Sequence, residues 1–238
     1  MQFYRRLLPV AAVSFDLDDT LYNNVPVMQR AEQAVRDYVV REFPQTATWQ
    51  PHDWAQLRQQ IMQRDVRLAS DMTQLRLTAL AAGLAHFGVP SAEAEAGATA
   101  AMAEFMRYRN LVEIDPQVHQ LLAQLSAKLP VIAISNGNVN VTEIGLAPYF
   151  QLILQPNAEL RGKPFTDMFE AAARQFPELH PQQWLHVGDS PYADVLGAHR
   201  AGWQSAWFTG GLGQAEHLRV LPTLAYQRLE DLTQHLLK

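Results

Sequence analysis

Five short apolar runs along the chain have the pattern of β-strands that are buried on both faces. They span residues 10–15, 131–135, 152–154, 184–187 and 205–208, and residues 221–225 form a weaker sixth candidate. Between these predicted strands, hydrophobic residues at helical spacing form two apolar helix faces. One consists of Val118, Leu121, Leu122 and Leu125, and the other of Phe165, Met168, Phe169 and Ala172. This alternation predicts an α/β fold with a Rossmann-like, doubly wound parallel sheet.

The interval between the first and second runs is far longer than a strand connection. It exceeds 100 residues, whereas a complete crossover in a parallel sheet takes about a dozen. Amphipathic helical faces fill it, and Asp71 and Ser91 are suitable N-caps for two of the helices. We therefore expect an α-helical cap domain of residues 24–112, inserted into an α/β core of residues 1–23 and 113–238. The insert follows the carboxyl end of the first strand, where open α/β sheets bind ligands.

The composition argues against several classes of function. The 238 residues are 48% hydrophobic, and 19 basic against 24 acidic residues give a net charge of −5, which argues against binding to nucleic acid or an anionic membrane. Without cysteine, the chain has no disulfide, thiolate metal site or cysteine nucleophile. The longest apolar stretch, residues 7–15, is too short to span a membrane. Acidic residues follow it with no cleavage site, so we expect a buried strand and a cytoplasmic protein.

Three carboxylates, those of Asp16, Asp18 and Asp19, follow the first predicted strand directly. Their mutual repulsion would be destabilising unless a cation or a shared proton compensated for it. Oxygen ligands of this kind suit a hard cation such as Mg²⁺. Two neighbouring carboxylates also allow one to stay ionised while the other serves as an acid. A solvated acidic turn that caps a helix is the alternative reading of this pattern taken alone.

Polar residues follow three further predicted strands. Ser135 and Asn136 could form an anion site at a helix N-terminus, although a simple turn has the same pattern. Lys163 lies on a loop that Pro164 stiffens, and Asp189 and Asp194 follow the strand at 184–187. Alone, the lysine would be read as surface charge and Asp189 as an N-cap. Because the carboxyl ends of parallel strands share one edge of the sheet, we expect all four groups to meet in one pocket.

Together these segments resemble the haloacid dehalogenase superfamily of phosphotransferases. The resemblance rests on FDLDDTL at residues 15–21, SNG at 135–137, KP at 163–164 and GDSPYAD at 188–194, and on the position of the insert. Within the superfamily, FDLDDTLYNN and the SNGN and KPF contexts resemble most a bacterial branch. That branch acts on flavin mononucleotide (FMN) and on 5-amino-6-(5-phospho-D-ribitylamino)uracil, a riboflavin precursor.

The resemblance implies catalytic roles for three residues of the first motif. Asp16 would be the nucleophile and would form an aspartyl phosphate. Asp18 would protonate the leaving alcohol and then take a proton from the attacking water. Thr20 would orient Asp18 or support the turn.

The resemblance also implies how phosphate and metal are held. Ser135 and the backbone of Asn136 would hold phosphate oxygens, and Lys163 would neutralise the charge shared by phosphate and nucleophile. A Mg²⁺ ion would be bound by Asp16, Asp189 and the main-chain carbonyl of Asp18. Asp194 would either reach the ion through water or brace Lys163.

The expected enzyme is a Mg²⁺-dependent phosphomonoester hydrolase acting on a small phosphorylated metabolite, with FMN or the ribitylaminouracil phosphate as the suggested substrate. A phosphosugar phosphatase or mutase of the same superfamily stays open, as does a non-catalytic module that binds a phosphorylated ligand. Carbon–halogen hydrolysis also occurs in the superfamily, but it needs neither an acid at Asp18 nor a metal, so the acid pair argues against it. The sequence leaves the oligomeric state open.

Several other residues have two readings. His186 lies within a predicted strand, which favours a packed, hydrogen-bonded side chain over a catalytic one. The GGLG segment at residues 210–213 is read as a loop because it lacks a dinucleotide fingerprint. Trp49, Trp54 and Tyr108 fall in or near the helical insert, where packing is favoured over stacking on a flat ligand ring.

Overall fold

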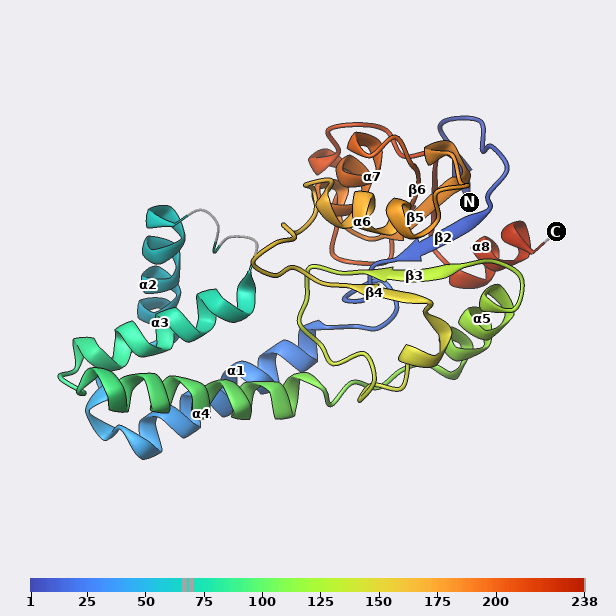
Figure 1. Ribbon diagram of the computed structural model, residues 1–238. Helices are drawn as coiled ribbons and strands as arrows, with labels where there is room; N and C mark the ends of the chain where they lie inside the picture. Colours follow the sequence, from blue (N-terminus) through green and yellow to red (C-terminus); the bar gives the residue numbers. More distant parts are fainter. Residues whose placement is uncertain (66–67, 69–70, 238) are drawn as a thin grey trace. The chain divides into compact units, whose positions relative to one another are not determined.

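The chain forms two compact units in the computed structural model (Figure 1), which describes residues 1–65, 68 and 71–237. The first unit consists of Met1–Asn24 and Glu113–Lys238, and the second of Val25–Val112. The first unit therefore contains every predicted strand, and the second contains the long interval between the first two. None of the helices in the described part of the chain combines the length and the apolar character that a membrane span requires.

A seven-stranded sheet with the order β1-β7-β6-β5-β2-β3-β4 forms the centre of the first unit. All neighbouring strands run parallel except β1, which pairs antiparallel with β7 at one edge. The strands are β1 Gln2–Phe3, β2 Ala12–Phe15, β3 Val131–Ile134, β4 Leu152–Leu154, β5 Trp184–Gly188, β6 Gln204–Phe208 and β7 Leu224–Tyr226. The predicted α/β class with a doubly wound parallel sheet is confirmed.

Two strands differ from the sequence prediction. The weak candidate at 221–225 becomes β7 at Leu224–Tyr226, because Pro222 lacks the N–H that a ladder needs. Strand β1 was not predicted, since its two residues are exposed and belong to no apolar run. The central strand β2 is buried along its whole length, as its unbroken apolar pattern indicated.

Helices cover both faces of this sheet, with α6 and α7 on one side and α5 and α8 on the other (Figure 1). They span α5 Pro116–Ser126, α6 Asp167–Gln175, α7 Leu196–Arg200 and α8 Leu229–Leu236. The predicted apolar face of α5 is buried in full. The predicted face of α6 is correct except at Phe165, which precedes the helix, is 41% exposed and lies against the guanidinium of Arg161.

The second unit is a helical bundle of α1 Val25–Glu42, α2 Pro51–Arg64, α3 Met72–His86 and α4 Ser91–Arg109, with a short 3₁₀ helix at Pro44–Thr48. Its core is formed by α1, α3 and α4 around Leu84 and Phe105. The carboxylate of Asp71 accepts from the backbone N–H of Gln74, so this predicted N-cap is confirmed. Ser91 is instead the first helical residue, and its hydroxyl donates to Glu95.

Candidate active site

The order of the strands brings the predicted site residues to one edge of the sheet. Strand β2 lies between β3 and β5, and Phe15 is level with Ala133 on one side and Val187 on the other. Asp16 follows Phe15, and its backbone N–H donates to the carbonyl of Val187 at 2.8 Å. Ser135 therefore follows one neighbouring strand and Asp189 the other, at the same end of the sheet.

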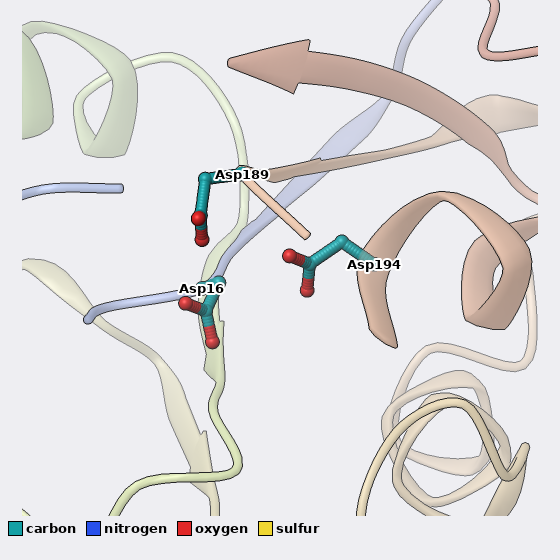
Figure 2. Close-up of side chains that lie close together, drawn as sticks. All are labelled: Asp16, Asp189 and Asp194. Atoms are coloured by element: carbon teal, nitrogen blue, oxygen red, sulfur yellow. The ribbon is translucent and has the colours of Figure 1, made fainter. Parts of the chain in front are cut away.

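Three carboxylates gather at this edge. Asp16, Asp189 and Asp194 are buried, and each places a carboxylate oxygen within 4.8 Å of the other two. Figure 2 shows the three carboxylates turned toward a common space. Burial, with the charges of Asp194 and Asp18, raises the pKa of Asp16 above its ordinary value despite the opposing charge of Lys163. Burial, with the charges of Asp194 and Asp19, raises the pKa of Asp189 to about 6.

Lys163 joins two of these carboxylates. Its ammonium nitrogen Nζ donates to Asp16 Oδ1 at 2.7 Å, to Asp194 Oδ1 at 2.6 Å and to the carbonyl of Ile134 at 2.6 Å. All three protons of the ammonium group thus have acceptors. Burial acts to lower the pKa of Lys163, but the two carboxylates outweigh it and raise the pKa above its usual range. The lysine is therefore a fixed cation at neutral pH.

Asn136 fixes the backbone of Lys163. Its side-chain oxygen accepts from the backbone N–H of Lys163 at 2.7 Å, and its side-chain nitrogen donates to the carbonyl of Lys163 at 2.8 Å. This pair of bonds links residues 27 positions apart, much as one rung of a β-ladder would. The sequence predicts a phosphate-binding role for Asn136, and no local pattern indicates this side-chain contact with Lys163.

Asp194 binds Lys163 and also the loop that precedes Asp194 in the sequence. Its Oδ1 accepts from Lys163 and lies 3.0 Å from His186 Nε2, and its Oδ2 accepts from the backbone N–H of Ser190 at 2.8 Å. Lys163 and His186 hold the pKa of Asp194 below its ordinary value although burial would raise it. His186 is fully buried, and its Nδ1 lies 2.7 Å from the hydroxyl of Ser14, so the reading of a packed, hydrogen-bonded histidine is confirmed.

The turn after β2 positions the remaining residues of the first motif. The hydroxyl of Tyr22 donates to Asp18 Oδ1 at 2.6 Å, and that of Thr20 donates to Asp189 Oδ1 at 3.3 Å. Asp19 has a positive φ of 57°, a left-handed conformation in which aspartate is more frequent than most residues. Its side chain accepts from the backbone N–H of Asn24 at 2.9 Å. Thr20 thus contacts the carboxylate of Asp189, whereas the sequence prediction gave it the role of orienting Asp18 or supporting the turn.

Ser135 does not begin a helix, contrary to the expectation of an anion site at a helix N-terminus. A loop follows it, and the backbone N–H of Gly137 donates to the serine hydroxyl at 3.3 Å. The short side chain bends its own backbone in a serine turn, which competes with helix formation. Ser135 is buried and follows β3 directly, so phosphate binding here would rely on loop groups alone.

Strand β6 and the segment after it contact Asp189. The indole N–H of Trp207 donates to the carbonyl of Asp189 at 2.7 Å, and the backbone N–H of Leu212 donates to Asp189 Oδ2 at 3.2 Å. A Cβ on Gly211 would lie 2.4 Å from the Cβ of Asp189, so only glycine allows this approach. The predicted loop at residues 210–213 is confirmed, and its glycines were the one available signal of a close contact.

Known proteins resemble this chain in sequence and in fold. The family model of haloacid dehalogenase-like hydrolases matches residues 10–202. The 5-amino-6-(5-phospho-D-ribitylamino)uracil phosphatase YigB of Escherichia coli (strain K12) is 38% identical over 236 residues, which covers 98% of this chain and 99% of the relative.

Two solved structures resemble the chain in fold. A 2-haloacid dehalogenase from Pseudomonas syringae pv. Tomato DC3000 has a TM-score of 0.87 and 30% identity, with 94% of this chain and 97% of the other covered. The HAD-hydrolase YfnB from Bacillus subtilis, bound to magnesium, has a TM-score of 0.66 at 20% identity, with 96% and 99% covered, and shows the fold alone. The predicted resemblance is confirmed, and the chain belongs to the haloacid dehalogenase-like hydrolases.

Proposed function

We propose that this hydrolase is a Mg²⁺-dependent phosphomonoesterase in which Asp16 is the nucleophile. The observation that carries the proposal is the contact of Lys163 with Asp16 and Asp194, inside a buried cluster of carboxylates. A single ammonium group cannot balance three carboxylates, so the cluster has an excess of negative charge. A dianionic phosphate could approach Asp16 only if further positive charge were bound there.

The residues present fit a magnesium ion. The donors are carboxylate oxygens, which a hard divalent cation prefers. Burial and the neighbouring carboxylates raise the pKa values of Asp16 and Asp189, and a bound cation would oppose both effects. Asp16, the main-chain carbonyl of Asp18 and Asp189 would hold the ion. The contacts of Asp194 with Lys163, His186 and Ser190 favour the bracing role for this residue. The bound metal would supply electrostatic stabilisation of phosphoryl oxygens.

In the first step, Asp16 attacks phosphorus and forms an aspartyl phosphate while the bond to the leaving alcohol breaks. Asp18 gives a proton to that alcohol, and the hydroxyl of Tyr22 fixes the orientation of its carboxyl group. Lys163 stabilises the negative charge on the transferring group together with Ser135 and the Asn136 backbone.

In the second step, Asp18, now ionised, takes a proton from a water molecule that attacks phosphorus. The bond between phosphorus and the carboxylate oxygen of Asp16 breaks, which restores Asp16 and releases inorganic phosphate. Thr20 steadies the opposite carboxylate of Asp189 throughout. The helical unit, Val25–Val112, would serve as the cap that selects the leaving group.

We further propose 5-amino-6-(5-phospho-D-ribitylamino)uracil, or the related FMN, as the substrate. The support is the 38% identity to YigB, which extends over nearly the whole of both chains. Dehalogenation, the activity named for the 30% identical Pseudomonas protein, has less support. Displacement of a halide requires neither an acid at Asp18 nor a metal, whereas this chain buries a carboxylate cluster and bonds Asp18 to Tyr22.

Substitution of Asp16 tests the covalent route. We expect Asp16→Asn to lower kcat roughly a thousandfold or more with an unchanged circular dichroism spectrum. Wild-type protein that is quenched in acid during turnover of a radiolabelled phosphomonoester should retain label, and the variant should not. Asp115→Asn is the matched control, because asparagine preserves the N-cap that Asp115 provides for α5. Turnover by Asp16→Asn at the wild-type rate would refute the mechanism.

A substrate panel tests the specificity. Phosphate release should be measured with 5-amino-6-(5-phospho-D-ribitylamino)uracil, FMN, glucose 6-phosphate and phosphoserine, and chloride or fluoride release with 2-haloacids. We expect the first two compounds to exceed the others in kcat/KM by about tenfold or more. A higher kcat/KM for the sugar phosphate would overturn the substrate assignment while leaving the phosphatase class intact, and halide release alone would overturn both.

A further inference from the structure

The helical unit contains a cavity of about 450 Å³ between α1, α2 and α3. All of its lining residues belong to this unit, from Glu32 to Leu80. Its volume lies within the range of small-molecule binding pockets. Aliphatic side chains such as Val35, Val39 and Leu80 form much of the wall, and arginine and tryptophan side chains complete it.

Positive charge in this cavity exceeds negative charge. Among the residues that the structure describes, the lining includes three arginines, Arg36, Arg58 and Arg76, and one carboxylate, Glu32. One oxygen of Glu32, Oε1, accepts from Arg76 Nη1 at 2.9 Å and lies 3.5 Å from Arg58 Nη1. Two guanidinium groups thus share a single carboxylate oxygen, and each guanidinium has five N–H donors in all.

Arg76 is more enclosed than Arg58, whose side chain is 30% exposed. Its side chain is 12% exposed, and its guanidinium carbon lies 3.8 Å from the centre of the Phe105 ring. Burial and the neighbouring cations Arg58 and Arg109 lower the pKa of Arg76, although Glu32 opposes them. A buried cation that is only partly compensated would gain from a second anion.

Two indole rings add flat apolar surface to the same cavity. Trp54 packs against α3 at Gly83, where a Cβ would lie 2.2 Å from the indole. Trp49 meets the Trp54 ring edge to face with centroids 5.0 Å apart, and it also contacts His86 and Phe87. Both tryptophans are only partly buried and line the cavity. Rings held in this way suit contact with a planar aromatic ligand.

We propose that this cavity of the helical unit binds a small aromatic anion, whose carboxylate, sulfonate or phosphate group pairs with Arg76 and Arg58 while its ring packs against Trp49 and Trp54. The guanidinium groups provide the planar donors that such anions match. The aliphatic and indole walls exclude water from the ring, which strengthens the ionic contact. The site goes beyond the phosphatase chemistry, because every group that forms it belongs to the helical unit.

The test uses 2-naphthoate as the anionic probe and 2-naphthamide as its neutral counterpart, titrated into the full-length protein by calorimetry. We expect the anion to bind about tenfold more tightly than the amide, with the same affinity in Asp16→Asn protein. No heat from 2-naphthoate at millimolar concentration, or equal affinity for the two probes, would overturn the proposal.

Variants locate the binding. Arg76→Gln should weaken 2-naphthoate binding about tenfold and leave 2-naphthamide unaffected. If Arg76→Gln unfolds, Ala55→Phe is the second variant, because Ala55 lines the cavity but is exposed, so a large ring there blocks the space without disturbing the core. Arg41→Gln removes the same charge from the exposed side of α1 and should bind like wild type. Equal loss in Arg41→Gln, or unchanged binding in Ala55→Phe, would contradict the assignment.

Discussion

The side chain of Asn136 forms two hydrogen bonds with the backbone of Lys163, at 2.7 and 2.8 Å. These bonds hold the loop from which Lys163 reaches Asp16, so the position of the ammonium group depends on an amide that touches neither carboxylate. We expect Asn136→Ala to lower kcat roughly 10-fold to 100-fold while the enzyme keeps its secondary structure. Asn157→Ala is the matched control, because the side chain of Asn157 lies on the same loop and accepts from the backbone N–H groups of Glu159 and Leu160. Steady-state kinetics of the two variants test whether the side chain of Asn136 positions Lys163 for catalysis.

Lys163 balances two buried carboxylates, so its removal should destabilise the protein. We expect Lys163→Met to lower the free energy of unfolding by about 3–5 kcal/mol in urea titrations without metal, because Asp16 and Asp194 would be left without their cation. Adding Asp194→Asn to this variant should restore part of the loss. Lys128→Met, at an exposed lysine, should change the stability by less than about 0.5 kcal/mol. Additive effects in the double variant would contradict a shared charge cluster.

Magnesium binding should depend on pH through Asp189. Its pKa of about 6 in the folded, metal-free protein exceeds the ordinary value of 3.8. The folded state therefore keeps a proton there that the unfolded chain has released, and this contribution to stability is lost as the pH rises through about 6. Mg²⁺ binds the ionised carboxylate and must displace that proton at lower pH.

We accordingly expect the difference in thermal midpoint between Mg²⁺-loaded and chelated protein to widen as the pH rises from about 4 to 7. Differential scanning fluorimetry at constant ionic strength measures it, and Asp189→Asn should remove most of the difference. A difference in thermal midpoint that stays constant across this pH range would argue against Asp189 as a ligand. Undiminished activity in excess chelator would argue against a role for the metal itself.

The segment after β6 should be needed for metal binding. A Cβ at Gly211 would lie 2.4 Å from Asp189 Cβ and 2.8 Å from the backbone oxygen of Asp19, so Gly211→Ala must push the two loops apart. We expect Mg²⁺ affinity, measured by calorimetry, to fall about tenfold or more. Gly210→Ala is the comparison variant, because its Cβ would meet the ring of Phe208 instead of the carboxylate loop. An unchanged affinity in Gly211→Ala would show that the segment only packs nearby.

The sequence by itself determined the class of the sheet and most of its strands. Buried parallel strands are continuous apolar runs, and this local pattern can be read without knowledge of the rest of the chain. It was misleading where Pro222 delays β7, and it could not reveal β1, whose two exposed residues form no apolar run. The types of the site residues were equally visible, because carboxylates, a lysine and a serine follow separate strands that end at one edge.

Only the tertiary structure decided how these groups meet. The contacts of Lys163 with Asp16, Asn136 and Asp194 join positions 147, 27 and 31 residues apart, and they depend on strand register and on the paths of loops. Loop paths also decide two further features of the site. A loop follows Ser135 where a helix was expected, and Gly211 approaches Asp189 closely. Local propensity fixes each segment separately, whereas burial of polar groups selects the one arrangement in which their charges and hydrogen bonds compensate one another.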